Sequence, residues 1–143
     1  MKVKKLPKDL HEKLFKLVPR VTTDAIIVKG KKVLLIKRDI PPCKGDWHLC
    51  GGTVLKGETL RQTLQREVRE ETGLKVKILK YAGYYDQPGR DQRGTVITHV
   101  FICQPIGGKL RGSFEGRELR FFAKLPKNIG FDHKKILRDA GFK

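Results

Sequence analysis

The segment from Thr59 to Thr72 restricts the fold more than any other part of the sequence, because its pattern is that of one amphipathic helix. Thr59 and Gln62 have the spacing of a capping box, and Gly73 suits the left-handed position that follows a helix. Three apolar residues fall within a stripe about 80° wide on the helix surface: Leu60, Leu64 and Val68. The stripe predicts that one side of this helix faces a core.

Three carboxylates share the side of the helix that carries the apolar stripe. Glu71 falls inside the stripe, and Glu67 and Glu70 fall on its edge. Carboxylates at such positions repel one another and are costly to bury without a partner. Arg66 supplies one positive charge, which is too little for three carboxylates, whereas a divalent cation with oxygen ligands is sufficient. The pattern favours a Mg²⁺ or Mn²⁺ site, and a solvated acidic face is the alternative.

The remaining pattern predicts strands around this helix and a further helix near each end of the chain. Helices are expected over residues 8–17 and 132–139. Runs of β-branched and apolar residues predict five strands: Val21–Val28, Val33–Lys37, Val76–Tyr85, Thr95–Gln104 and Glu118–Ala123. A mixed sheet carrying a few helices is an α+β arrangement. Gly51 and Gly52, upstream of the main helix, allow close backbone approach to a ligand or metal, and a tight turn is the alternative.

The chain has 143 residues, the usual size of one domain, so a single domain over residues 1–143 is expected, with residues 1–20 as an N-terminal helical extension. No apolar run approaches a membrane span, and the first residues lack the apolar stretch of a secretory signal. A cytoplasmic protein is therefore expected. The three cysteines, Cys43, Cys50 and Cys103, form no CxxC pair, which argues against a disulfide framework and a zinc ribbon.

The balance of charge is strongly basic. Thirty-two Lys and Arg residues against fifteen Asp and Glu residues give a net charge of +17. Such a charge attracts polyanions, which include nucleotides, RNA and acidic surfaces. A lysine-rich solvated surface is the alternative, and the charge alone does not identify a substrate.

The segment from Gly52 to Leu74 resembles the Nudix box, the signature of a large family of hydrolases. The box reads Gly, five residues, Glu, seven residues, Arg-Glu-apolar, any residue, Glu-Glu, any residue, Gly-apolar. This chain matches every fixed position without a gap: Gly52, Glu58, Arg66-Glu67-Val68, Glu70-Glu71 and Gly73-Leu74. A weaker resemblance extends over residues 21–140. It implies the family's α/β/α sandwich with a mixed β-sheet, and hydrolysis of a pyrophosphate linkage in a nucleoside diphosphate derivative.

The resemblance also implies roles for individual residues. The metal would be held by three carboxylates and one backbone carbonyl: Glu67, Glu70, Glu71 and Gly52. Arg66 and Glu58 would pair with each other and orient the helix carboxylates. Cys50 stands where relatives often have proline, a departure that affects only the local turn.

The implied chemistry requires a carboxylate that accepts a proton. A pyrophosphate is anionic and repels a nucleophile, and a bound metal neutralises its oxygens and lowers the pKa of a bound water. A carboxylate then takes the proton of that water. In relatives this base is either a Glu of the box or a Glu on a later loop. Glu115 and Glu118 are the late candidates, and Glu118 stands just before the predicted last strand.

Residues 86–95 bear on the choice of substrate. The run from Pro88 to Gly94 resembles the Pro-x-Arg-Asp-x-Arg-Gly element of the small ADP-ribose pyrophosphatases, and residues 131–137 resemble their C-terminal segment. Arg90 and Arg93 suit phosphate oxygens, and Asp91 suits sugar hydroxyls; a polar connecting loop is the alternative. Three aromatic residues are candidates for stacking on a base, with core packing as the alternative: Trp47, Tyr84 and Tyr85.

Three functions remain open. The first is hydrolysis of ADP-ribose, or a related nucleoside diphosphate sugar, to AMP and ribose 5-phosphate. The second is hydrolysis of nucleoside triphosphates or RNA 5′ ends, which the charge suits but the loop does not favour. The third is a catalytically idle domain that senses a nucleotide, against which the intact box argues. The expected partners are a nucleotide-derivative substrate and, because relatives often dimerise, a second copy of the chain; no membrane is expected.

Overall fold

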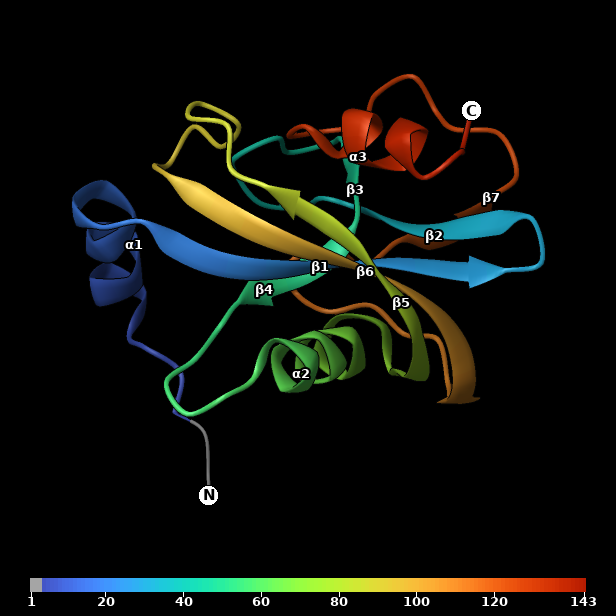
Figure 1. Ribbon diagram of the computed structural model, residues 1–143, viewed down its shortest axis with the longest axis horizontal. Helices are drawn as coiled ribbons and strands as arrows, with labels where there is room; N and C mark the ends of the chain where they lie inside the picture. The colour runs from blue at the N-terminus through green and yellow to red at the C-terminus, as the bar shows by residue number, and fades with distance from the viewer. Residues whose placement is uncertain (1–3) are drawn as a thin grey trace.

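The computed structural model describes residues 4–143 as one mixed β-sheet with a helix on each face and a further helix at one end (Figure 1). The elements follow one another in this order: α1 (Lys8–Leu17), β1 (Arg20–Lys29), β2 (Lys32–Lys37), β3 (Trp47–His48), β4 (Cys50–Thr53), α2 (Leu60–Thr72), β5 (Leu74–Tyr85), β6 (Val96–Gly108), β7 (Leu119–Phe122) and α3 (His133–Asp139). The predicted extension consists of α1 and the approach to β1. Its first three residues lie outside the described part of the chain.

The sheet has the strand order β3-β2-β1-β6-β5, with β4 paired to β1 and β7 paired to β2. The central pair, β1 and β6, is parallel and runs from Arg20 opposite Val96 to Ile27 opposite Cys103. The other strand pairs are antiparallel. The sheet is therefore mixed, as the sequence predicts.

Two apolar cores lie on opposite faces of the sheet, and each is closed by one helix (Figure 1). The core under α2 contains the predicted stripe residues Leu60, Leu64 and Val68. The core under α3 contains Ile136 and Leu137 from that helix. Because each helix buries its apolar side against the sheet, the molecule is an α/β/α sandwich and the predicted fold class is confirmed.

The ends of α2 follow the predicted capping chemistry. The Thr59 hydroxyl accepts a hydrogen bond from the Gln62 backbone N–H at 3.1 Å, and the Gln62 side-chain oxygen accepts one from the Thr59 N–H at 2.9 Å. Gly73 ends the helix with φ 76° and donates its N–H to the Arg69 carbonyl. A non-glycine residue adopts this backbone conformation only at a cost.

The strands β3 and β4 are absent from the sequence prediction, which left residues 47–53 as loop or turn. β4 pairs with β1, and Gly51 lies opposite Asp24. A Cβ atom at Gly51 would overlap the Thr23 carbonyl oxygen and the Asp24 carboxylate. The glycine pair therefore serves close approach within a strand, a use that turn propensity alone does not reveal.

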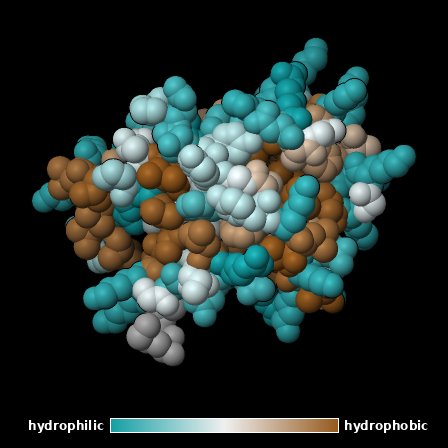
Figure 2. Space-filling model, in the orientation of Figure 1, coloured by the Kyte–Doolittle hydropathy of each residue, from teal (hydrophilic) through white to brown (hydrophobic). Residues whose placement is uncertain are grey.

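Apolar side chains remain exposed at the end of the molecule where α1 lies. Figure 2 shows brown atoms gathered there, and Leu10, Leu17 and Val18 are exposed. α1 buries only Phe15 fully. Within residues 4–143, no helix is long and apolar enough to cross a membrane.

Candidate active site

The carboxylates of α2 lie next to Arg66, whose guanidinium is hydrogen-bonded to Glu58 and to the Thr53 carbonyl. Arg66 Nε donates to Glu58 at 2.7 Å, and its terminal nitrogens donate to Glu58 at 3.0 Å and to the Thr53 carbonyl at 3.1 Å. Arg66 also donates to Glu67 at 2.6 Å. The hydrogen bond from Arg66 lowers the pKa of Glu58, so this carboxylate is charged at neutral pH. The predicted pairing of Arg66 with Glu58 is present, and it ties the helix to the chain that follows β4.

Glu71 is the most buried carboxylate of the cluster, at 4% exposure. It accepts hydrogen bonds from the Gly51 N–H at 3.1 Å and from the Cys50 thiol at 3.2 Å. Burial raises the pKa of Glu71 well above its usual value, and the nearby carboxylates of Glu67 and Glu115 raise it further. Burial also raises the pKa of Glu67, against the opposing effect of Arg66. Both residues therefore lie where negative charge exceeds positive charge.

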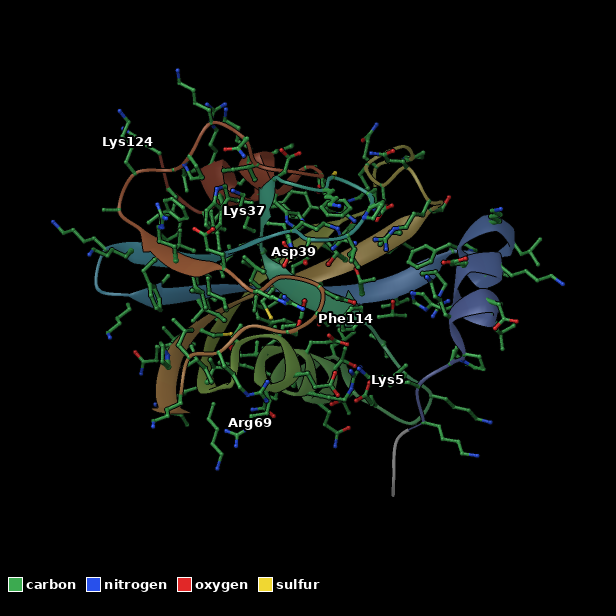
Figure 3. The ribbon with its side chains drawn as sticks, turned by 180° about the vertical axis from the view of Figure 1, so that it is seen from behind. Lys5, Lys37, Asp39, Arg69, Phe114 and Lys124 are labelled. Carbon is green, nitrogen blue, oxygen red and sulfur yellow. The ribbon has the colours of Figure 1, made fainter. Side chains whose placement is uncertain are left out.

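The chemistry of this donor set fits a divalent cation. The Glu67 carboxylate is near enough to Glu71 to raise its pKa, and a Cβ atom at Gly52 would overlap the Glu67 carboxylate. Neighbouring buried carboxylates favour the uptake of a proton or a cation. In residues 4–143, no three acidic, histidine or cysteine side chains converge as a finished ligand set. Glu70 instead forms an ion pair with Lys5, which lies beside α2 in Figure 3.

A further set of buried polar residues lies next to β4. Asp24 is buried on β1, and its carboxylate accepts a hydrogen bond from the Thr98 hydroxyl at 2.7 Å. His133 accepts a hydrogen bond from the Leu49 N–H at 2.9 Å, and its other ring nitrogen lies 3.8 Å from Asp24. Burial raises the pKa of Asp24 to about 6 and lowers the pKa of His133 to about 3. These groups fix the strand that carries Gly51 and Gly52.

The two late acidic candidates, Glu115 and Glu118, both lie in the loop before β7 but have different surroundings. Its backbone is fastened to the end of β2, because the Glu115 carbonyl accepts the Asp39 N–H at 2.8 Å. Figure 3 shows the loop, with Phe114 labelled, passing close to Asp39. Glu115 acts on the pKa of Glu71, whereas Glu118 forms an exposed ion pair with Arg120 at 2.9 Å. Glu115 is therefore the late acidic residue that lies close to the cluster.

The predicted substrate loop is largely satisfied by internal ion pairs. Arg90 donates to both oxygens of Asp132 at 2.8 and 2.7 Å, and only 5% of its side chain is exposed. Asp91 accepts from the Arg93 side chain at 3.0 and 2.7 Å and from the Arg93 N–H at 2.9 Å. Arg90 and Asp91, which the sequence suggests for substrate phosphate and sugar, are each paired within the fold, and this favours the alternative of a polar connecting loop. Arg93 remains partly exposed.

Trp47 is a further correction. Its ring is 7% exposed and packs edge-on against Phe122 at 4.8 Å, with Arg120 over the ring. The residue belongs to the core under α3, so it is not free to stack on a base. Tyr84 is 60% exposed on β5, and Tyr85 donates its hydroxyl to Asp139 at 2.7 Å. Neither tyrosine contacts the carboxylate cluster in the part of the chain that the structure describes.

A family comparison agrees with this geometry. The NUDIX domain family matches residues 18–139, which is most of the chain and includes the whole cluster.

The chain belongs to the Nudix family.

Among curated Nudix relatives, an ADP-ribose pyrophosphatase from Methanocaldococcus jannaschii is 46% identical over 134 residues, covering 92% of this chain and 79% of that protein. A human 8-oxo-dGDP phosphatase is 34% identical over 104 residues, covering 72% of this chain but 30% of that protein. The resemblance to the first extends over nearly the whole of this chain and about four fifths of that protein. The resemblance to the second covers one part of a longer protein.

Solved Nudix structures share the fold. A MutT NUDIX hydrolase from Burkholderia pseudomallei superposes with a TM-score of 0.78 at 27% identity, covering 85% of this chain and 98% of that one. A bifunctional NMN adenylyltransferase/ADP ribose pyrophosphatase from Francisella tularensis, complexed with AMP and a manganese ion, gives 0.73 at 25% identity, covering 92% and 43%. The sandwich is therefore that of the Nudix hydrolases.

Several residues of this Nudix site lie outside the box and escaped sequence reasoning. Asp24, His48 and His133 are buried polar residues, and Arg38 is a buried cation at the end of β2. One signal was available in the sequence, since Asp24 is the one charged residue of the predicted strand Val21–Val28. The histidines show no metal-ligand spacing, and only the fold brings His48 on β3 and His133 on α3 near each other.

Proposed function

We propose that this Nudix hydrolase cleaves the pyrophosphate bond of ADP-ribose, giving AMP and ribose 5-phosphate. The observation that carries the reaction is the pair of buried carboxylates Glu67 and Glu71, whose pKa values are both raised, beside a fixed Arg66–Glu58 pair. Such a cluster is suited to hold a cation against a polyanionic substrate. The cluster supports the reaction class, and similarity to relatives supports the substrate.

The metal in this proposal is Mg²⁺ or Mn²⁺, because the donors are hard oxygens. Three carboxylates and one carbonyl would hold it: Glu67, Glu70, Glu71 and Gly52. When bound, the metal neutralises phosphate oxygens and acidifies a water molecule. Lys5 would leave Glu70 free for this role by giving up an exposed ion pair, which is worth little in water.

The protein side chains have separate tasks in this reaction. Arg66, held by Glu58, orients Glu67 and prevents it from turning away from the substrate side of α2. The Gly51 N–H fixes Glu71. The proton of the attacking water passes to a carboxylate, and we assign that role on the late loop to Glu115 in preference to Glu118. Glu115 lies close enough to Glu71 to raise its pKa.

ADP-ribose is favoured as substrate by two comparisons. The relative from Methanocaldococcus jannaschii that shares 46% of its residues is an ADP-ribose pyrophosphatase. The Francisella tularensis protein, a bifunctional enzyme with ADP ribose pyrophosphatase as one of its activities, is complexed with AMP, which is one product of ADP-ribose cleavage. Nucleoside triphosphates and diphosphates are the second candidate class, because the more distant human relative is an 8-oxo-dGDP phosphatase.

Initial-rate measurements on a panel of substrates test the proposal. The panel contains ADP-ribose, 8-oxo-dGTP, 8-oxo-dGDP and 5′-triphosphate RNA, each with Mg²⁺, with Mn²⁺ and with excess chelator. We expect the highest kcat/KM for ADP-ribose and no turnover with chelator. Full turnover in chelator would contradict the metal site. A higher kcat/KM for 8-oxo-dGTP than for ADP-ribose would contradict ADP-ribose as the preferred substrate.

Location and assembly are part of the same proposal. We place the enzyme in the cytoplasm, where nucleotide derivatives are available and its free cysteines stay reduced. A homodimer is the proposed assembly, and the exposed leucines of α1 support an apolar contact. Sedimentation equilibrium measures the assembly directly.

A further inference from the structure

A row of alternating guanidinium groups and phenyl rings crosses one end of the sheet. Arg20 lies over the Phe15 ring at 5.4 Å, and Arg93 lies over the same ring at 4.4 Å. Arg93 also lies 5.7 Å from the centroid of the Phe131 ring, and Arg38 lies 5.2 Å from the same centroid. The row therefore gathers three positive charges from β1, from the end of β2 and from the loop before β6. None of them belongs to the Nudix box.

The positive charge of this row is not balanced by the fold. Arg93 is paired with Asp91, but Arg20 and Arg38 form no ion pair within residues 4–143. Arg38 is 7% exposed and its Nε has no hydrogen-bond partner; within residues 4–143 its guanidinium makes one hydrogen bond, a long one of 3.4 Å to the Pro41 carbonyl. Burial and the nearby Arg93 lower the pKa of Arg38. A buried cation with so few partners requires an anion that the described chain does not provide.

His48 lies beside the same Phe131 ring and lacks a hydrogen-bond donor for its Nε2 among the described residues, whereas Arg38 lacks an acceptor for its Nε. Its ring centroid lies 6.3 Å from that of Phe131, and the residue is 4% exposed. Nδ1 lies 2.7 Å from the Leu49 carbonyl, which only accepts, so Nδ1 carries the proton. Nε2 is then an acceptor, and it is buried without a donor. Burial lowers the pKa of His48 to about 3, so the ring is neutral at pH 7.

Both groups lie close to the catalytic carboxylates. The residue after Arg38 is Asp39, whose N–H is bonded to the Glu115 carbonyl. The charges of Glu115 and Glu71 both act on Arg38. His48 is followed by Leu49, and the next residue, Cys50, donates to Glu71. A ligand that reaches the carboxylate cluster is therefore adjacent to one unpaired donor and one unpaired acceptor.

The backbone of Phe131 also marks this place. Phe131 has φ 54°, a left-handed conformation that is costly for an aromatic residue. Its ring centroid lies 5.2 Å from the Arg38 guanidinium and 6.3 Å from the centroid of the His48 ring, so one aromatic residue contacts both polar groups.

We propose that Arg38 and His48 bind one ribosyl phosphate unit of the substrate, Arg38 through a phosphate oxygen and His48 Nε2 by accepting a hydrogen bond from a sugar hydroxyl. An anion alone would satisfy Arg38 but not His48, and a neutral sugar would satisfy His48 but not Arg38. A ribosyl phosphate carries both groups a few bonds apart. The assignment rests on the proposed function, because it takes ADP-ribose as the ligand.

Binding without turnover tests this assignment. Isothermal titration in excess chelator measures the Kd of ADP-ribose and of inorganic pyrophosphate for the wild type, Arg38→Met and His48→Leu. We expect Arg38→Met to weaken both ligands by about 10-fold or more, since it removes a charged hydrogen bond. We expect His48→Leu to weaken ADP-ribose by about 5-fold or more and to leave pyrophosphate within about twofold, because pyrophosphate has no sugar.

The matched control is Arg120→Met, which removes an arginine that also lies over aromatic rings but is exposed and paired with Glu118. It should leave both Kd values within about twofold. A melting curve separates binding from folding, because removing an unpaired buried charge should not lower the melting temperature. If Arg38→Met does not fold, Arg38→Lys is measured instead. We expect Arg38→Lys to bind both ligands more weakly than the wild type at an unchanged melting temperature.

The outcomes are distinct. Unchanged pyrophosphate affinity in Arg38→Met overturns the phosphate contact. Equal losses of affinity in Arg38→Met and Arg120→Met also overturn it, because they would show that only the overall positive charge affects binding. Loss of pyrophosphate binding in His48→Leu overturns the hydroxyl contact. A wild type that binds ADP-ribose in this way but does not hydrolyse it with any metal contradicts the proposed function and leaves the assignment of the two residues standing.

Discussion

Glu67 is subject to two opposing interactions, and their balance shows what the site lacks without a cation. Arg66 donates to it at 2.6 Å, which favours the charged carboxylate, while burial and Glu70 favour the neutral form. Its charge repels that of Glu71 whenever both groups are charged, which raises the pKa of Glu71. The fold therefore holds Glu67 in a position that is useful for catalysis and unfavourable for stability, a combination common at active sites.

Replacing Glu67 by glutamine should separate these two effects. We expect Glu67→Gln to lower kcat by about 10²- to 10⁴-fold, the range for loss of a charge-stabilising or proton-transferring group. The melting temperature should not fall, because the substitution removes repulsion with Glu71. Glu12→Gln, at an exposed position on α1, is the control and should change neither quantity. Wild-type kcat in Glu67→Gln would remove this residue from the catalytic set.

His133 predicts how acid affects stability. Burial lowers its pKa from 6.5 to about 3 in the folded protein, so between these values the unfolded chain binds more protons than the native one. The free energy of unfolding should then fall as pH decreases from 6.5, by about 2 kcal/mol at pH 5 from this residue. His48 acts in the same direction, and Asp24, with a pKa raised to about 6, acts in the opposite direction.

Urea titrations of the wild type and His133→Asn at pH 7 and pH 5 check this. The variant should lose about 2 kcal/mol less than the wild type between the two pH values. Other charged groups that act on the pKa of His133 are the same in both proteins: Asp132, Arg90, Arg38 and Asp91. An equal pH dependence in the two proteins would show that His133 does not titrate as described.

At the scale of elements, the sequence specifies α2 better than any other part, because its capping, periodicity and carboxylates are all local. Gly73 is one example, since its left-handed backbone follows from its place after the helix. By contrast, β3 and β4 depend on partners: Gly51 is extended because β1 and Asp24 lie against it. The pairs Arg90–Asp132 and Leu49–His133 join segments far apart in the chain, so no local pattern reveals them.

Gly73, at the end of α2, and Gly83, within β5, form a matched pair of glycines. A Cβ atom at Gly73 would overlap the Lys109 carbonyl oxygen, whereas at Gly83, also at positive φ, it would meet nothing within 4 Å. Gly83→Ala should therefore cost only the backbone term of about 1–2 kcal/mol. Gly73→Ala should cost about 1–3 kcal/mol more, since the backbone must shift. Urea denaturation measures both, and equal costs would mean that the chain around Lys109 yields freely.

The loop from Pro88 to Gly94 is expected to act as a structural connection through its ion pairs. Breaking the buried Arg90–Asp132 pair with Arg90→Ala should lower the free energy of unfolding by about 3–5 kcal/mol, since it leaves Asp132 without its partner. Lys135→Ala breaks an exposed pair with Asp139 and should cost less than about 0.5 kcal/mol. A small loss in Arg90→Ala, together with a higher KM for ADP-ribose, would restore Arg90 to the substrate site.

At the scale of the whole molecule, the net charge of +17 should act on the rate of substrate capture. Raising the salt concentration from about 20 mM to about 150 mM should lower kcat/KM severalfold and by similar factors for all anionic substrates, because screening acts on the field they share. kcat should stay constant. The measurement is the salt dependence of both quantities for ADP-ribose and 8-oxo-dGTP. A reversal of substrate preference with salt would mean that the charge takes part in recognition.

The parallel pairing of β1 with β6 determines when the protein can begin to fold during synthesis. β1 is made early, but its partner is complete only when Cys103 has been added. Until then α2, with its acidic face, lacks the full sheet on which it packs. Pairing between segments so distant in sequence is slow to form and leaves apolar surface open meanwhile. The nascent chain therefore keeps apolar surface open at least until Cys103 has been added, and its net charge of +17 disfavours association with other copies in that interval.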